Sequence, residues 1–243
     1  MTPPFFLIDA LPDGERAELA GSEGRHAATV RRIRAGERVH LGDGAGGIAE
    51  CTVRAVLPGG LALDVQRRRT VPAPDPWLVV VQALAKGDRG ERAVELLTEL
   101  GVDEIVPWAA GRSVVRWEGE RGGKALARWR STAREATKQS RRARLPRLSE
   151  RHDSVAVTAL LAAADTSVVL HEAADRPLGD VTLCRTGRVL VVVGPEGGVT
   201  GDELTAFAAA GAVPARLGPE VLRTSTAGAA ALAVLSARLG RWS

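Results

Sequence analysis

The pattern of apolar and polar positions changes once along this chain, close to residue 74. Before that point, short alternating stretches interrupted by glycine predict β-strands within residues 5–9, 37–44, 47–60 and 61–66. After it, continuous apolar runs such as 77–85 predict strands that are covered on both faces. The proline-rich segment 71–77 between the two regions predicts an extended linker. We therefore expect two domains, residues 1–73 and residues 74–243.

The second region alternates strands with segments whose apolar residues recur at helical spacing. Further strands are predicted within residues 103–108, 166–172, 188–198 and 213–220. Helices are predicted at residues 88–101, 121–143, 154–165, 200–211 and 224–240. This alternation is typical of an α/β fold with a parallel sheet and crossover helices, here preceded by a smaller β-rich domain.

The composition is that of an ordinary globular protein, with 45% hydrophobic and 26% charged residues. No apolar run approaches the roughly 20 residues that a membrane-spanning helix needs, and the start of the chain lacks the features of a signal peptide. We therefore expect a cytoplasmic protein that does not associate with a membrane. The two cysteines, Cys51 and Cys184, are too few for a disulfide framework.

Several common functional motifs are absent from the sequence. Gly42, Gly44 and Gly47 fit the pattern G-x-G-x-x-G, but strands are predicted on both sides of them, whereas a dinucleotide site needs a following helix. The three glycines therefore predict a hairpin turn. The four histidines are scattered, and no HExxH, GxSxG or Walker motif occurs, so no metal site, serine-hydrolase site or P-loop is expected.

Basic residues are concentrated in one part of the chain. The net charge is only +4, yet residues 112–151 hold 13 Lys and Arg against 4 Asp and Glu. On a helix over residues 126–142, five cations would lie on one side with only Glu135 as an acidic neighbour, namely Arg130, Arg134, Lys138, Arg141 and Arg142. Such a face is either merely solvated or binds nucleic acid, and its small share of acidic residues favours RNA.

In open α/β sheets, ligands bind outside the carboxyl ends of the strands. Three loops of this chain directly follow predicted strands and would therefore lie at that edge. They begin at Leu170, Gly194 and Leu217. Glycines in these loops allow a ligand to approach the backbone closely, and Thr200 with Glu203 predicts a capping box for the next helix. Each Gly-Pro-Glu sequence could be a simple turn, but its occurrence after two strands favours a ligand site.

The same loops carry a resemblance to a known family. The sequence GPEGG followed by a helix, and then LGPEVLRTSTAGAAALAVL, resembles the closing motifs of the RsmE family, which are 16S rRNA uridine-N3 methyltransferases of the SPOUT superfamily. The likeness extends upstream through AREATKQSRRARLP, RGERAVELLTELGVDEIVPW and the H-x4-R-R-x-R pattern that begins at His26. Two positions depart from the family's usual glutamates, Lys138 and Ser225.

The resemblance implies a PUA-like β-barrel in the first domain and a SPOUT domain with a C-terminal trefoil knot in the second. It also implies S-adenosylmethionine (SAM) as cofactor, 16S rRNA in the small ribosomal subunit as partner, and an active site between two subunits. The cofactor-binding residues that it implies are Leu170, His171, Glu172, Gly194, Pro195, Glu196, Gly197, Gly198, Leu217, Gly218, Leu222, Thr226 and Ala227.

The implied reaction also suggests roles for basic residues. Uridine N3 must lose a proton before it attacks a methyl group, so a cation that stabilises the developing anion is needed, and Arg223 is the candidate catalytic residue. The alternative is that Arg223 only pairs with a carboxylate or a phosphate. The candidate RNA-binding residues of the first domain are Arg25, His26, Arg31, Arg32 and Arg34, in addition to the five cations above.

The last predicted helix bears on the oligomeric state. Its stretch 227–235 is apolar or glycine on every side, and such a helix must be buried all round. We expect a second copy of the chain to cover it in a two-fold symmetric homodimer, the alternative being cover by its own chain. Two functional alternatives also stay open: a SPOUT methyltransferase that acts on another RNA, and a catalytically silent RNA-binding factor of ribosome assembly.

Overall fold

The computed structural model describes residues 2–242, which fall into two compact units. The first unit contains the chain up to Ala73 together with Thr137–Leu145, and the second contains Pro74–Ala136 and the chain from Pro146 onward. Within the described residues, no helix is both long and apolar enough to cross a bilayer.

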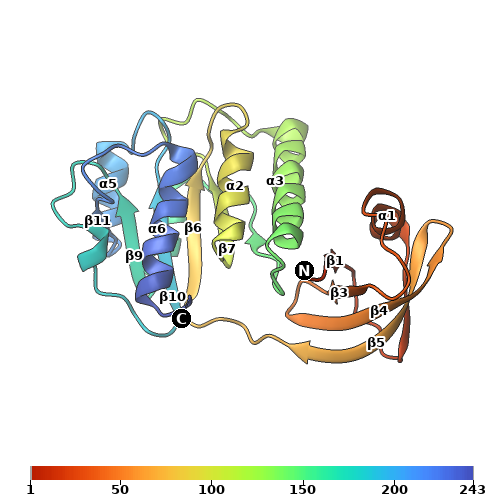
Figure 1. Cartoon of the computed structure of the whole chain (residues 1–243). Coiled ribbons are helices and arrows are strands. Elements are labelled where there is room, and N and C mark those ends of the chain that lie inside the picture. Colours follow the sequence, from red (N-terminus) through yellow and green to blue (C-terminus); the bar gives the residue numbers. More distant parts are fainter. Residues whose placement is uncertain (1, 243) are drawn as a thin grey trace. The chain divides into compact units, whose positions relative to one another are not determined.

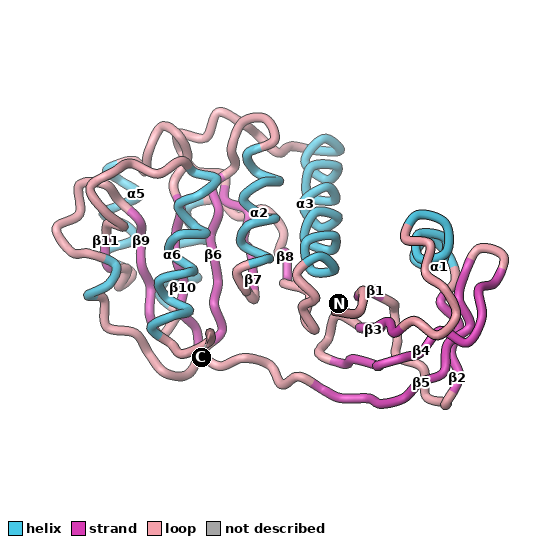
Figure 2. The backbone as a smooth tube through the Cα atoms, viewed as in Figure 1, coloured by secondary structure: helices cyan, strands magenta, loops and turns pink. Residues whose placement is uncertain are grey.

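The first unit is built on a five-stranded sheet with strand order β1-β3-β4-β5-β2 (Figures 1 and 2). The strands are β1 (Phe5–Leu7), β2 (Arg16–Leu19), β3 (Arg38–Gly42), β4 (Gly47–Leu57) and β5 (Gly60–Thr70). Strands β3 and β4 are antiparallel neighbours, with Gly42 opposite Ile48. This pairing confirms the hairpin turn predicted from Gly42, Gly44 and Gly47.

Three short elements of the first unit were not predicted, namely β2, the helix α1 (Gly21–Arg25) and the π-helical turn η1 (His26–Val30). Each is five residues or shorter, which is too short to show a helical or strand periodicity. They are held by burial instead, because Leu19 and Ala27 lie in the core beside Phe6, Val39 and Leu63.

Residues 137–145 attach to the first unit through main-chain hydrogen bonds. The amide of Leu145 donates to the carbonyl of Gly44 at 2.9 Å, and the amide of Gly46 donates to the carbonyl of Ala143 at 3.0 Å. The Arg144 guanidinium donates to the Val71 carbonyl at 2.8 Å. This segment is therefore a fixed part of the unit although it is distant from it in sequence.

The second unit contains a six-stranded sheet with strand order β11-β9-β10-β6-β7-β8. The strands are β6 (Trp77–Ala83), β7 (Glu104–Trp108), β8 (Arg147–Leu148), β9 (Thr166–Leu170), β10 (Arg188–Val193) and β11 (Val213–Ala215). Every neighbouring pair is parallel, which confirms the predicted α/β architecture.

Helices cover both faces of this sheet (Figure 1). Alternate strand residues such as Val80 and Val191 pack against α2 (Arg89–Glu99), α3 (Gly119–Gln139) and α6 (Thr224–Arg238). The opposite face packs against α4 (Ser154–Ala162) and α5 (Gly201–Ala209), and a short 3₁₀ helix, η2, spans Leu178–Asp180. Cover on both faces explains why the strands are continuously apolar.

Two predictions about helices need correction. Helix α3 ends at Gln139, so Arg141 and Arg142 follow the helix and do not belong to its face. Arg141 adopts a left-handed backbone with φ of 56°, which cannot continue an α-helix. Helix α6 is largely covered by its own chain, through α2, β6, β10 and η2, and its partly exposed positions are Thr226, Ala230, Ala233 and Val234.

Candidate active site

A cavity of about 530 Å³ lies in the second unit where β9, β10 and β11 end. Its walls come from the loops that begin at Leu170, Gly194 and Leu217, and the start of α6 lines it as well. The carboxyl ends of neighbouring parallel strands meet at one edge of a sheet, so loops far apart in sequence form one site.

The cavity brings together most of the residues that the sequence marked. Twelve of the thirteen candidate cofactor residues line it, namely Leu170, His171, Glu172, Gly194, Pro195, Glu196, Gly197, Gly198, Leu217, Gly218, Leu222 and Ala227. The candidate catalytic residue Arg223 lines it as well. Thr226 is not among the lining residues, and its hydroxyl donates to the carbonyl of Arg223 at 3.2 Å.

Two glycines of the loop after β10 have a structural requirement. Gly198 adopts φ of 74°, a conformation that side chains rarely allow. A Cβ at Gly194 would lie 2.9 Å from a methyl group of Val199, closer than real Cβ atoms approach. The loop therefore follows the end of the strand tightly and leaves its backbone exposed to the cavity.

Three arginines that line the cavity were not predicted from the sequence, namely Arg89, Arg112 and Arg216, and the first two contact the loop after β10. Arg89 donates to the Glu196 carboxylate at 3.0 Å, and Arg112 donates to the carbonyl of Gly197 at 3.1 Å. They lie beyond the carboxyl ends of β6 and β7, so extending the strand-end argument to these strands could have found them. Burial alone would raise the pKa of Glu196, but main-chain hydrogen bonds and Arg89 lower it below its usual value.

Behind the loop, the Glu203 carboxylate connects three segments of the second unit. It accepts hydrogen bonds from the Gly111 amide at 2.8 Å and the Ser154 hydroxyl at 2.6 Å, and from the Thr200 amide at 2.9 Å and hydroxyl at 3.0 Å. The predicted capping box of α5 is thereby confirmed. Burial would raise the pKa of Glu203, yet these hydrogen bonds lower it.

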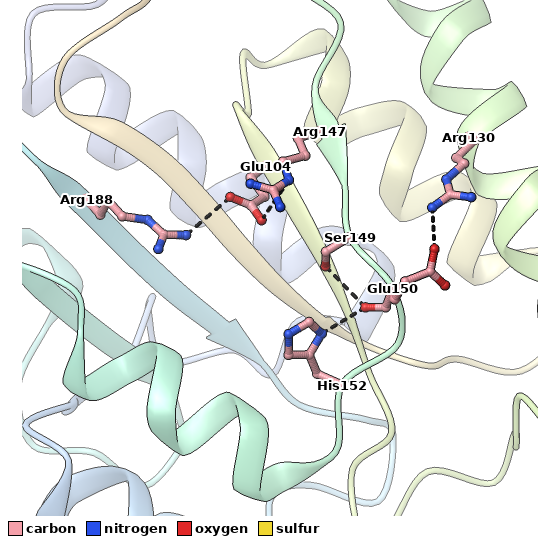
Figure 3. Close-up of polar contacts among 7 residues, drawn as sticks. All are labelled: Glu104, Arg130, Arg147, Ser149, Glu150, His152 and Arg188. Carbon is pink, nitrogen blue, oxygen red and sulfur yellow. Dashed lines mark hydrogen bonds and ion pairs between the residues drawn. The ribbon is translucent and has the colours of Figure 1, made fainter.

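The candidate RNA-binding cations are less isolated from acidic groups than the sequence suggested. Figure 3 shows Arg130 of α3 paired with Glu150, at 2.7 Å. Lys138 pairs with Glu23 at 2.8 Å, and both side chains are nearly buried. The prediction that Glu135 is the only acidic residue near these cations was therefore wrong, because Glu23 and Glu150, from distant parts of the chain, also reach them.

The candidate RNA-binding residues divide between the two units. Arg130 and Arg134 lie on α3 in the second unit, whereas Arg25, His26, Arg31, Arg32, Arg34, Lys138, Arg141 and Arg142 lie in the first. Most of the first-unit residues are exposed, while His26, Lys138 and Arg142 are partly buried. The structure thus brings Lys138, Arg141 and Arg142 into the same unit as the N-terminal group.

A second charged cluster spans the amino ends of the strands. Glu104 of β7 is buried and lies between Arg188 of β10 at 3.2 Å and Arg147 of β8 at 3.8 Å (Figure 3). Both arginines balance the buried carboxylate, so this cluster ties strands together. No group of three or more potential metal ligands occurs among the described residues 2–242.

Comparisons with protein families and with known proteins all find RNA methyltransferases. Residues 72–236 match the RNA methyltransferase domain family, and residues 19–62 match the RNA methyltransferase PUA domain family. Ribosomal RNA small subunit methyltransferase E of Mycobacterium tuberculosis is 47% identical over 100% of this chain and 94% of its own length. The corresponding Bacillus subtilis protein is 29% identical over 90% and 88%.

A solved structure resembles the whole chain. It is a ribosomal RNA small subunit methyltransferase E from Neisseria gonorrhoeae bound to S-adenosyl methionine, 26% identical, with a TM-score of 0.86 and 100% coverage of both chains. A Legionella pneumophila protein in complex with SAM is 27% identical with a TM-score of 0.87, and the alignment covers 98% of each chain.

Proposed function

The chain belongs to the ribosomal RNA small subunit methyltransferase E family, and we propose that it transfers a methyl group from SAM to N3 of a uridine in 16S rRNA. The observation that carries this proposal is the cavity formed by the three strand-end loops, which contains twelve of the candidate cofactor residues together with Arg223. The relatives that contain SAM support the choice of cofactor.

The cavity fits SAM in its chemistry. The backbone around Gly194 and Gly198 is open to a flat ring, whose edge the main-chain groups of these loops would bind. Leu170, Leu217 and Ala227 supply apolar surface. Glu172, Glu196 and Glu220 also line the cavity, and their carboxylates would accept hydrogen bonds from the ribose hydroxyls or the amino group of SAM.

SAM supplies a methyl group on a positively charged sulfur, so the transfer itself needs alignment more than acid–base assistance. The acceptor does need assistance, because uracil N3 carries a proton. Arg223 precedes α6 and is exposed at the cavity, where its guanidinium would stabilise the negative charge that develops on the uracil ring as the N3 proton passes to solvent water. Lys138 and Ser225 replace acidic residues of the family pattern, and this mechanism assigns no catalytic role to either.

Membership of this family also implies finer features of the two domains. We propose that the loops after β10 and β11 and helix α6 form a trefoil knot, and that residues 1–73 form a PUA-like barrel that contacts RNA. The sheet order, in which β10 lies between β9 and β6, supports a chain path that returns into the sheet. Action on rRNA in bacteria also supports a cytoplasmic location.

A homodimer is part of the proposal. Thr226, Ala230, Ala233 and Val234 leave a strip of small side chains partly exposed along α6, beside the cavity. Small residues let a second helix approach closely, and a two-fold axis there would place Arg223 of each subunit near a shared cleft. The chain itself covers α6 more extensively than the sequence suggested. The support for a dimer is therefore limited to this partly exposed strip.

The test is methylation of 16S rRNA from a strain that lacks the gene, alone and within small subunits, with the methylated uridine mapped at nucleotide resolution. Methylation of a different RNA would favour the alternative substrate. Absence of SAM binding by calorimetry would favour a silent assembly factor. For the role of Arg223, we expect Arg223→Met to lower kcat about 100-fold while SAM affinity changes little; equal activity would refute a catalytic role.

A further inference from the structure

Two arginines adopt a backbone conformation that usually requires glycine. Among residues 2–242, the non-glycine residues with positive φ are Arg32, at 51°, and Arg141, at 56°. Twelve glycines occupy the other positive-φ positions. Arginine is therefore unusual at these two positions, because a side chain disfavours the left-handed backbone.

Each arginine follows the end of a helical segment, and a main-chain hydrogen bond spans each end. After η1, the amide of Ile33 donates to the carbonyl of Ala27 at 3.1 Å across Arg32. After α3, the amide of Arg142 donates to the carbonyl of Thr137 at 3.0 Å across Arg141. Glycine is the favoured residue at the left-handed position of such a helix end, so each arginine adopts a conformation that its side chain disfavours.

The two helix ends meet at one small hollow in the first unit. Its lining residues are Pro4, Phe5, Phe6, His26, Arg31, Lys138, Gln139 and Arg141. Arg31 directly precedes the left-handed Arg32, and Arg141 is left-handed itself. More than 100 residues of sequence separate the two sides, and the main-chain bonds of residues 143–145 to the β3–β4 turn hold them in one unit.

The charges at the hollow favour an anion. Lys138 is ion-paired with Glu23, with side chains 10% and 14% exposed, so its charge is balanced inside the unit. Arg31 and Arg141 are exposed to solvent. Nearby, burial lowers the pKa of His40, and the positive charges of Arg69, Arg38 and Arg141 lower it further against the opposite effect of Glu50.

The shape favours a phosphate group over a base. Phe5 and Phe6 are 6% and 2% exposed, and His26 meets the ring of Phe6 edge-on at 6.4 Å, so the phenyl rings offer no open face for stacking. Arg31 and Arg141 line this small polar hollow, and a guanidinium binds phosphate oxygens through two parallel N–H donors, so the lining suits a phosphate group.

We propose that this hollow binds a phosphodiester of the rRNA substrate, with Arg31 and Arg141 as the contacting residues. The proposal rests on the proposed function, because it takes the RNA from there. It joins the N-terminal basic group and the end of α3 into one contact site in the first unit, where the sequence suggested two separate surfaces.

Arg141→Gly is the informative variant, because it removes the guanidinium and the backbone strain together. We expect its melting temperature to rise by about 2 °C while its affinity for 16S rRNA falls about tenfold. Arg31→Gln should weaken RNA binding similarly. Each variant should reduce the slope of log affinity against log salt by about 0.7–0.9. Arg16→Gln is the matched control, since Arg16 is exposed on β2 at the opposite edge of the same sheet.

Calorimetry with SAM and methylation by the parent protein separate this proposal from the proposed function. If the parent protein methylates rRNA and the Arg31 and Arg141 variants keep its RNA affinity and salt slope, the phosphate site is overturned while the proposed function stands. If the parent protein does not bind SAM, the proposed function is overturned. A loss of RNA affinity confined to the Arg31 and Arg141 variants still supports the phosphate site in that case. Tight binding of inorganic phosphate that depends on Arg141, without any effect on RNA affinity, would assign the hollow to a free anion and overturn the RNA proposal.

Discussion

The side-chain amide of Gln82, fully buried in β6, donates a hydrogen bond of 3.2 Å to the main-chain carbonyl of Thr224, 142 residues further along the chain. A second hydrogen bond, of 3.3 Å, goes to the carbonyl of Ala83. Thr224 is the first residue of α6 and lines the cavity. One amide thus holds the start of α6 against the end of β6, and it thereby fixes the backbone that carries Arg223.

We expect Gln82→Met to weaken SAM binding about fivefold, because the start of α6 loses this donor while the side-chain volume is preserved. The stability should change little, since the buried Gln82 carbonyl oxygen, which has no hydrogen-bond partner among the described residues, is removed as well. Calorimetry with SAM and thermal unfolding measure the two effects. Gln66→Met, at an exposed position of β5, is the control; equal SAM affinity in both variants would contradict the positioning role.

Glu203→Gln should destabilise the protein by about 2 kcal/mol at neutral pH, because an amide cannot accept all four hydrogen bonds. The folded-state pKa of Glu203 is lowered from 4.5, so the contribution of its charge is complete above about pH 4.5 and is lost as the pH falls through the folded pKa. The difference between parent and variant should therefore shrink below that pH. Urea unfolding at several pH values measures it, and a difference independent of pH would disagree with this assignment.

Gly194→Ala should reduce SAM affinity at least tenfold, because its Cβ would lie 2.9 Å from a methyl group of Val199 and would push the loop into the cavity. Gly201→Ala is a matched control, since a Cβ there meets nothing within 4 Å and alanine favours the first turn of α5. Calorimetry compares the two variants. Unchanged binding by Gly194→Ala, with a normal melting temperature, would place the cofactor elsewhere.

Ala230→Arg and Ala233→Arg should convert the proposed dimer to monomers and impair methylation, because both positions lie on the partly exposed strip of α6. Sedimentation measures the oligomeric state, and folding is checked by the melting temperature. If the parent protein is a monomer at micromolar concentration and still methylates rRNA, neither the dimer nor a shared active site can be maintained.

The sequence by itself determined the division into a β-rich first region and an α/β second region, because alternation and helical spacing are local patterns. It also determined the cavity loops, since a buried strand must end and the residues after it must lie at the sheet edge. The capping box at Thr200 and Glu203 is local as well. The motifs after β10 and β11 indicated the family, and the relatives that match the whole chain agree with that assignment.

The tertiary structure alone decided which distant groups meet. The pairs Lys138–Glu23 and Arg130–Glu150 join residues 115 and 20 positions apart, and no helical period indicates such partners. The short elements α1 and η1 are stabilised by burial of Ala27 and its neighbours, a contribution that five residues do not show in their own pattern. The left-handed backbones of Arg32 and Arg141 likewise depend on how each helix ends against its surroundings, because local preference alone would put glycine there.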